Sequence, residues 1–199
     1  CDVVNRGMAA WGERLYLGTL DGRLVALDRE TGEEAWSTVT VDQSKPYTIT
    51  GAPRVIDGKV IIGNSGAEFG VRGYVSAYDA DTGEQLWKFE TIARTGTPGG
   101  DTWNNIDDMF RAGNDTWITP SYDAETNTVY VGVSQPKPWM PISRGMSTSD
   151  AALYSNSTLA LDADTGELKW HYQHVPGEVM DLDEVFERVL IDRGDQKLV

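Results

Sequence analysis

The amino-acid sequence predicts an all-β fold, and within that class part of a β-propeller. The first observation is the pattern Ala-Leu-Asp-x-x-Thr-Gly-Glu-x-x-Trp, which occurs at residues 26–36, 77–87 (with Tyr78 for the leucine) and 160–170. Each copy follows a short apolar run typical of a strand, and its Asp-Thr-Gly segment is typical of a tight turn. We expect each copy to form a hairpin whose tryptophan fills the same kind of pocket in every unit.

Two further observations support the propeller. Residues 8–18 predict one hairpin and residues 52–63 another, the second through Asp57-Gly58. An Asp-Gly pair between alternating apolar residues is the strongest short-range hairpin signal. A weaker unit without the tryptophan, residues 121–132, lies between the second and third copies. Four short antiparallel strands repeated about every 40–50 residues are typical of propeller blades.

The length of the chain predicts only part of a propeller. Its 199 residues hold about three to four blades, whereas propellers close with roughly four to eight. The sequence starts at Cys1 without a methionine, and residues 196–199 have the pattern of a strand that enters another unit. We interpret residues 1–199 as an internal part of one larger propeller domain.

Charge and composition exclude some classes of partner. The formal net charge is −14, with 31 acidic residues against 17 basic ones, which argues against nucleic-acid binding. The same charge suits a basic protein partner that is attracted electrostatically. No run of about 18 apolar residues is present, so we expect no membrane span. One cysteine cannot form a disulfide within the chain.

Irregular segments are the candidates for a functional site. Residues 63–73 are rich in small side chains, which let a planar ligand or another backbone come close. Glu68 within them is either a solvated charge or a metal ligand. Residues 93–114 form a long loop, and such loops are usually functional or disordered. Trp117 is either a core aromatic residue or a flat surface on which a ring stacks.

Near the C-terminal end, residues 177–187 are acidic. If residues 180–183 are extended, Asp181 and Asp183 share one face, because side chains of a strand alternate. Two carboxylates on one face repel each other unless a cation or a proton lies between them. The alternative is the start of an acidic helix, where carboxylates interact favourably with the helix dipole.

Together these segments resemble the quinoprotein alcohol dehydrogenases, the methanol and ethanol dehydrogenase family that uses pyrroloquinoline quinone (PQQ). The tryptophan repeats alone are not specific, because non-enzymatic propellers carry similar ones. The site segments are more specific, since they occur in the order of the family and with near-family spacing. The resemblance covers essentially the whole chain and implies part of an eight-bladed quinoprotein propeller.

The resemblance assigns residues to the quinone site. Cys1 matches the second cysteine of an adjacent pair whose disulfide lies over the quinone, and Arg6 matches the arginine that hydrogen-bonds the quinone carbonyls. Thr50 matches a threonine that contacts a cofactor carboxylate, and Trp117 matches the tryptophan beneath the ring. The remaining implied quinone contacts are Ser65, Gly66, Ala67, Glu68 and Asp115.

The chain departs from the family pattern at three positions. Asp115 replaces a common threonine, Gln135 replaces a common metal-binding asparagine, and Met180 replaces the tryptophan before the catalytic aspartate, here Asp181. Asp183 matches the extra aspartate of lanthanide-using members, and a trivalent ion needs more negative charge around it. The implied metal ligands are Glu68, Gln135, Asp181 and Asp183. We expect a lanthanide(III) ion, with Ca²⁺ as the alternative.

The resemblance also implies a reaction and a location. A periplasmic enzyme would oxidise a primary alcohol to an aldehyde, with Asp181 as general base and hydride transfer to metal-activated PQQ. Arg6 would stabilise the developing oxyanion. A c-type cytochrome would accept the electrons, and the oligomeric state, including a homodimer, stays open. We expect this chain to be inactive alone. The alternatives are a non-catalytic scaffold propeller and a family member that has lost its metal.

Overall fold

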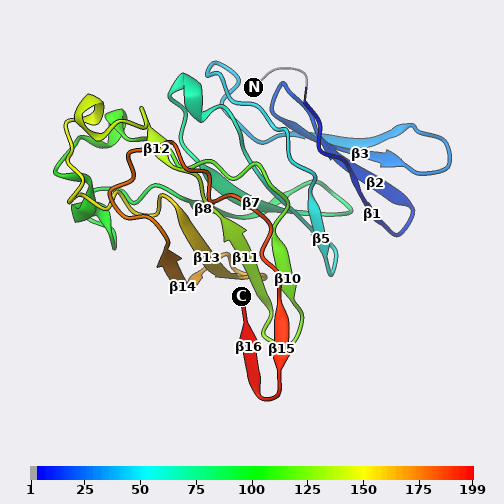
Figure 1. The fold of residues 1–199 in the computed structure, drawn as a ribbon. Helices are drawn as coiled ribbons and strands as arrows, with labels where there is room; N and C mark the ends of the chain where they lie inside the picture. The colour runs from blue at the N-terminus through cyan, green and yellow to red at the C-terminus, as the bar shows by residue number, and fades with distance from the viewer. Residues whose placement is uncertain (1–3) are drawn as a thin grey trace.

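Four-stranded antiparallel sheets occur three times in the computed structural model, which describes residues 4–199 (Figure 1). The first sheet contains β1 (Ala9–Trp11), β2 (Arg14–Gly18), β3 (Arg23–Asp28) and β4 (Glu34–Val39). The second contains β5 (Arg54–Ile56), β6 (Lys59–Gly63), β7 (Tyr74–Asp79) and β8 (Gln85–Glu90). The third contains β10 (Ser121–Asp123), β11 (Thr128–Gly132), β13 (Ser157–Asp162) and β14 (Leu168–Gln173). These sheets confirm the antiparallel units expected from the repeats.

Shorter elements connect the sheets. Two strand pairs are β9 (Ala112–Gly113) with β12 (Pro136–Lys137), and β15 (Ile191–Arg193) with β16 (Gln196–Leu198). The 3₁₀ helices are η1 (Ala67–Phe69), η2 (Gly100–Trp103), η3 (Asp108–Phe110) and η4 (Pro141–Arg144). Within residues 4–199 no helix is long and apolar enough to cross a bilayer.

The turn of each repeat is fixed by its aspartate. In every copy, one carboxylate oxygen accepts a hydrogen bond from the backbone N–H of the threonine three residues later, at 2.8 Å in the first two copies and 3.1 Å in the third. The following glycine has a φ of +74°, +74° and +72° in the three copies, a backbone conformation that glycine adopts without strain. The pattern Asp-x-x-Thr-Gly therefore specifies the turn through interactions within five residues.

The tryptophan of a repeat docks on the turn of the next sheet. The indole Nε1 of Trp36 donates to the carbonyl oxygen of Ala80 at 3.0 Å. Its ring lies so close to Gly83 that a Cβ atom there would be 2.7 Å from Cε3. Trp87 has the same relation to Gly166, where a Cβ atom would be 2.6 Å from Cε3. The predicted common pocket is confirmed for these two copies.

The third tryptophan is placed differently. Trp170 is 43% exposed, whereas Trp87 is 7% exposed. Within residues 4–199 no further four-stranded sheet follows the one that contains Trp170. Its ring packs against Tyr130, with 5.8 Å between the ring centroids.

Buried apolar side chains fill the spaces between neighbouring sheets. One cluster joins the first two sheets and includes Tyr16, Leu24, Ile49, Val60, Ile62 and Tyr78. The larger cluster joins the second and third sheets and includes Ile61, Val75, Trp87, Trp103, Val129 and Leu159. Removal of this apolar surface from water is the main force that holds the sheets together.

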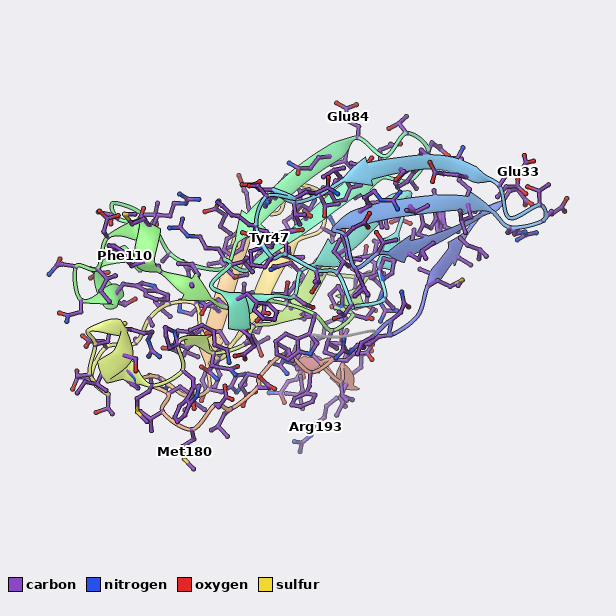
Figure 2. All side chains as sticks on the ribbon, turned by 90° about the horizontal axis from the view of Figure 1, so that it is seen from above. Glu33, Tyr47, Glu84, Phe110, Met180 and Arg193 are labelled. Carbon is purple, nitrogen blue, oxygen red and sulfur yellow. The ribbon has the colours of Figure 1, made fainter. Side chains whose placement is uncertain are left out.

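The irregular segments gather away from the hairpin tips. Figure 2 shows Glu33 at the far tip of the β3–β4 hairpin, while Phe110 and Met180 lie at the other end of the molecule. The candidate site residues come from the loops, and the sheets supply the rigid frame that holds these loops.

Candidate quinone and metal site

Three of the predicted quinone contacts form a hydrogen-bonded row. Nη1 of Arg6 donates to Oγ1 of Thr50 at 2.6 Å, and the Arg6 backbone N–H donates to the Thr50 carbonyl oxygen at 2.9 Å. Oγ1 of Thr50 lies 2.7 Å from Oγ of Ser65. Thr50 and Ser65 are buried and Arg6 is exposed. Arginine carries five N–H donors, so the exposed guanidinium can also bind an anionic ligand.

The segment after Ser65 needs a glycine. Ser65 and Thr48 exchange backbone hydrogen bonds of 2.8 and 3.1 Å, which fixes the start of the segment. Gly66 has a φ of +109°, and a Cβ atom there would lie 2.5 Å from the carbonyl oxygen of Pro46. This tight turn leads into η1, which presents the exposed carboxylate of Glu68.

Asp115 lies buried behind this segment. Its Oδ2 accepts a hydrogen bond from the backbone N–H of Ala67 at 3.2 Å, and its Oδ1 accepts one from the Ser134 hydroxyl. Burial raises the pKa of Asp115 to about 6, against the opposing effect of these hydrogen bonds. Both carboxylate oxygens are occupied by protein donors, so Asp115 connects η1 to the end of β11. A direct contact with the quinone stays a prediction.

The remaining predicted quinone contacts are Trp117 and Cys1. Trp117 is half-buried, and its backbone lies against Gly51, where a Cβ atom would be 2.5 Å from the Trp117 carbonyl oxygen. The tryptophan is therefore held beside the segment that carries Thr50. Cys1 lies outside the described residues.

Two of the four predicted metal ligands, Glu68 and Asp181, pair with the ammonium group of Lys137, and a third, Gln135, bonds to Asp181. Nζ of Lys137 forms an ion pair with Glu68 and lies 2.9 Å from Oδ1 of Asp181. The same Oδ1 accepts a hydrogen bond from Nε2 of Gln135. The hydrogen bond from Lys137 lowers the pKa of Asp181. Burial lowers the pKa of Lys137, but its hydrogen bonds with Glu68 and Asp181 outweigh burial and raise it overall.

The backbone around Asp181 differs from both expectations. Asp181 has a φ of +59°, and residues 177–190 form neither a strand nor a helix, so the extended and helical interpretations are both wrong. The carboxylate of buried Glu178 accepts backbone hydrogen bonds from Met180 and Leu182, which forces a tight loop. Burial raises the pKa of Asp183, and the negative charge of Asp181 adds to this effect.

The donor set fits a hard cation by its chemistry. Oε1 of Gln135 is buried and has no hydrogen-bond partner among the described residues. Carboxylate and amide oxygens are the ligands that hard cations prefer. No group of three or more His, Cys, Asp or Glu side chains within residues 4–199 is arranged to hold a metal ion. The structure therefore brings together two carboxylates and one amide side chain, with an ammonium group already between the carboxylates, and ligation by Asp183 stays a prediction.

Sequence reasoning missed the residues that position this site. Lys137, Ser134 and Glu178 are all buried and all bond to predicted site residues or to the loop that carries them. Only Lys137 carries a usable signal. Its neighbours Pro136 and Pro138 restrict the backbone on both sides, which marks the position as conformationally fixed.

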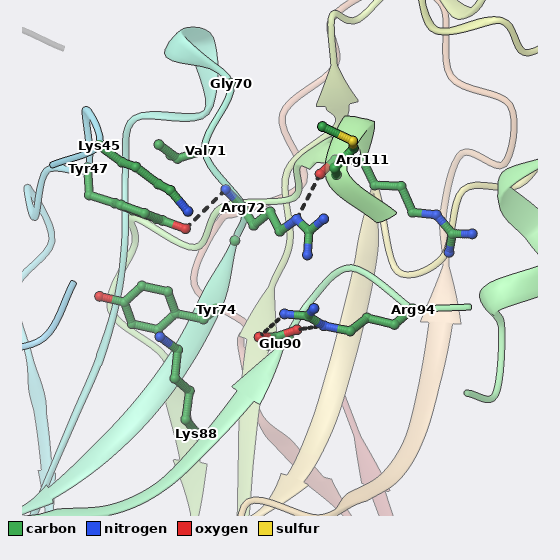
Figure 3. Close-up of a pocket in the computed structure, with 12 residues that line it drawn as sticks. Lys45, Tyr47, Gly70, Val71, Arg72, Tyr74, Lys88, Glu90, Arg94 and Arg111 are labelled. Carbon is green, nitrogen blue, oxygen red and sulfur yellow. Dashed lines mark hydrogen bonds and ion pairs between the residues drawn. The ribbon is translucent and has the colours of Figure 1, made fainter. Parts of the chain in front are cut away.

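A cavity away from the candidate site is lined by several basic side chains. It has a volume of about 520 Å³ and is lined by Lys45, Arg72, Lys88, Arg94 and Arg111 among others (Figure 3). Arg94 pairs with Glu90, and Nζ of Lys88 lies 3.8 Å from the ring centroid of Tyr74. None of the predicted site residues lines this cavity, so it is not the candidate site.

Comparisons with known proteins agree with this geometry. A family model described as "PQQ: Glucose/ethanol/alcohol dehydrogenase, beta-propeller domain" matches residues 6–197. The quinohemoprotein alcohol dehydrogenase ADH IIB of Pseudomonas putida is 49% identical over 194 residues, which cover 91% of this chain and 28% of that protein. The chain thus spans less than a third of the length of this relative.

Solved structures give the same result. The quinohemoprotein alcohol dehydrogenase ADHIIG of Pseudomonas putida HK5 superimposes with a TM-score of 0.85 at 41% identity, over 99% of this chain and 31% of that one. A europium-containing methanol dehydrogenase gives a TM-score of 0.84 at 35% identity, over 97% of this chain and 36% of that one. The chain therefore belongs to the quinoprotein family, as part of the β-propeller domain of PQQ-dependent alcohol dehydrogenases.

Proposed function

We propose that the protein containing this chain oxidises a primary alcohol to an aldehyde, with PQQ as its cofactor. The observation that supports this most is the meeting of Glu68, Gln135 and Asp181 at one charged centre. These residues come from distant parts of the sequence and match the metal ligands and the catalytic base of the family. The hydrogen-bonded row that begins at Arg6 supports the quinone side of the same proposal.

Asp181 is the proposed general base. A base must be ionised before it accepts a proton, and in the metal-free site the hydrogen bond from Lys137 holds the pKa of Asp181 below its usual range. The carboxylate would take the hydroxyl proton of the alcohol on Oδ1 or Oδ2. A bound quinone would supply the hydride acceptor, and a bound metal ion would supply the positive charge that makes this acceptor more electrophilic. The guanidinium of Arg6, held by Thr50, would stabilise negative charge that develops on oxygen.

The proposed metal ligands are Glu68, Gln135, Asp181 and Asp183. Oε1 of Gln135 is a buried acceptor that has no hydrogen-bond partner within residues 4–199, and the three carboxylates would supply negative charge. We propose a lanthanide(III) ion, because Asp183 adds a third carboxylate, and Ca²⁺ is the alternative. A structural relative at 35% identity is a europium-containing enzyme, which supports the first choice.

The proposed setting follows from the family. We propose a periplasmic protein that passes electrons to a c-type cytochrome. Relatives named quinohemoproteins support electron transfer to haem, since their names indicate that they carry haem themselves. Fractionation of cells that produce the whole protein would test the location.

Reconstitution of the whole protein tests the reaction. The metal-free protein is loaded with PQQ and either La³⁺ or Ca²⁺, and dye-linked oxidation of short primary alcohols is followed. Activity with La³⁺ that is lost in Asp183→Ala supports the proposal in full. Activity with Ca²⁺ alone keeps the enzyme and overturns the role of Asp183. Absence of activity and of quinone binding with either ion would overturn the dehydrogenase proposal.

A further inference from the structure

We propose that Lys137 is an internal cation that competes with the metal ion for Glu68 and Asp181, so that metal binding requires displacement of its ammonium group. This inference rests on the proposed function, because it concerns the same site. It goes beyond that function by assigning Lys137 a role in metal affinity.

The backbone of Lys137 is fixed by strand pairing. Strand β12 pairs with β9 in the register Pro136↔Gly113 and Lys137↔Ala112. Directly before it, the carbonyl oxygen of Gln135 accepts a hydrogen bond from the backbone N–H of Asn114 at 3.0 Å. The lysine stem therefore starts from a rigid position on the same short segment as a proposed metal ligand.

The side chain of Lys137 is almost fully buried. The residue is 5% exposed, and lysine at this burial needs paired acceptors. Its ammonium group bonds to Glu68 and to Asp181, and these carboxylates are themselves 62% and 46% exposed. A buried cation thus faces two carboxylates that solvent can reach. This arrangement lets an incoming ion approach the carboxylates from the open side.

The ammonium group and a metal ion would use the same oxygen atoms. Nζ of Lys137 and Nε2 of Gln135 both donate to Oδ1 of Asp181. A metal ion on these carboxylates would repel the ammonium group at short range. It would also require Gln135 to turn its oxygen, now without a partner, toward the ion. The two cations therefore exclude each other at this position.

Two consequences follow from this exclusion. Without a metal ion, Lys137 neutralises part of the carboxylate repulsion and keeps the ligands together. With a metal ion, the lost ion pairs reduce the net affinity. Removal of the lysine charge should therefore strengthen metal binding, although the same change removes a contact from the metal-free site.

The experiment measures metal affinity, independently of enzyme activity. The whole protein, freed of metal with a chelator, is titrated with Tb³⁺ while tryptophan-sensitised terbium luminescence is recorded. Lys137→Met keeps the apolar stem and removes the charge. Lys59→Met is the matched control, because Lys59 is also largely buried and pairs with Asp164 at 2.9 Å, away from this site. Circular dichroism checks that both variants are folded.

The expected result is at least about tenfold tighter Tb³⁺ binding by Lys137→Met, with no change in Lys59→Met. In competition experiments, Ca²⁺ should also bind Lys137→Met more tightly than the wild type, and Lys59→Met with unchanged affinity. Equal or weaker Tb³⁺ binding by folded Lys137→Met would overturn the proposal, as would absence of Tb³⁺ binding in both the wild type and Lys137→Met. PQQ binding, measured separately by quenching of tryptophan fluorescence, shows whether the proposed function survives that failure.

Discussion

The Nζ atom of Lys137 lies 2.9 Å from Oδ1 of Asp181 and is also paired with Glu68. These ion pairs connect the second and third sheets at the candidate site. Glu68 lies in η1, between β6 and β7 of the second sheet, and Lys137 lies in β12, between β11 and β13 of the third sheet. In the metal-free site these ion pairs lower the pKa of Asp181 and link two of the proposed metal ligands. Several measurable consequences follow from this contact and its neighbours.

Glu178 should position Asp181 without touching the substrate. Its carboxylate accepts backbone hydrogen bonds from Met180 and Leu182, which flank Asp181. Glu178→Ala should release this loop and lower kcat for alcohol oxidation by about tenfold or more, because small misplacement of a catalytic group is costly. Glu178→Gln keeps an acceptor oxygen and should restore most of kcat. The affinity for PQQ should not change in either variant. Equal loss of kcat in both variants would contradict a positioning role.

Asp115 should make stability depend on pH. Its folded-state pKa of about 6 lies above the ordinary value of 3.8, so the folded state binds the proton more tightly. The stabilisation by this proton is present below about pH 4 and is lost as the pH rises to about 6. The free energy of unfolding of Asp115→Asn, relative to the wild type, should therefore rise by about 3 kcal/mol between pH 4 and pH 7.

Denaturant titrations of the whole protein at several pH values measure this difference. The exposed Asp81, whose side chain is 89% exposed, provides the control substitution Asp81→Asn. If the stability of Asp115→Asn relative to the wild type does not change with pH, burial does not raise the pKa of Asp115 in the folded protein.

Thr50 should hold Arg6 for the quinone. Thr50→Val removes hydrogen bonds to Arg6 and Ser65, and we expect PQQ affinity to fall about tenfold, equivalent to about 1.4 kcal/mol. The matched control is Thr40→Val, because Thr40 is also buried with two hydrogen bonds, here to Gly22 and a tyrosine hydroxyl. Fluorescence titration with PQQ measures both. The same loss of affinity in both variants would indicate a general loss of structure instead.

Gly83 should be essential for docking of neighbouring sheets. An alanine there must tolerate a φ of +74° and a Cβ atom 2.7 Å from the Trp36 ring. We expect a loss of about 2–4 kcal/mol in stability, from overpacking added to backbone strain. Gly58→Ala is the control, because its φ is +76° and no atom lies within 4 Å of the added Cβ. This control should lose only about 1 kcal/mol. Thermal unfolding of the whole protein compares the two.

The blades could be predicted from the sequence because their signals are local. The turn of each repeat depends on an aspartate, a threonine and a glycine within six residues, and Asp57-Gly58 does form the expected hairpin between β5 and β6. The sequence predicts that the tryptophans of the repeats fill equivalent pockets, but it does not identify Gly166 as the residue that Trp87 contacts. Gly166 lies in the next repeat, and only the tertiary structure shows the contact.

The site was predicted less completely because it depends on contacts between distant loops. The resemblance assigned Glu68, Gln135 and Asp181, and the structure brings these three together. It gave no reason to expect Lys137 between them. The left-handed backbone of Asp181 was also missed, because hydrogen bonds to Glu178 override the local pattern.

The proposed reaction at this site is the reduction of PQQ with electrons from an alcohol. The most direct measurement loads the whole metal-reconstituted protein with oxidised PQQ and follows the cofactor absorbance after one addition of ethanol, without an electron acceptor. The account predicts rapid conversion to reduced PQQ and one equivalent of acetaldehyde in the wild type. It also predicts at least about a thousandfold slower conversion in Asp181→Asn with PQQ still bound. Bound PQQ that stays oxidised in the wild type, or an Asp181→Asn variant as fast as the wild type, would contradict the account.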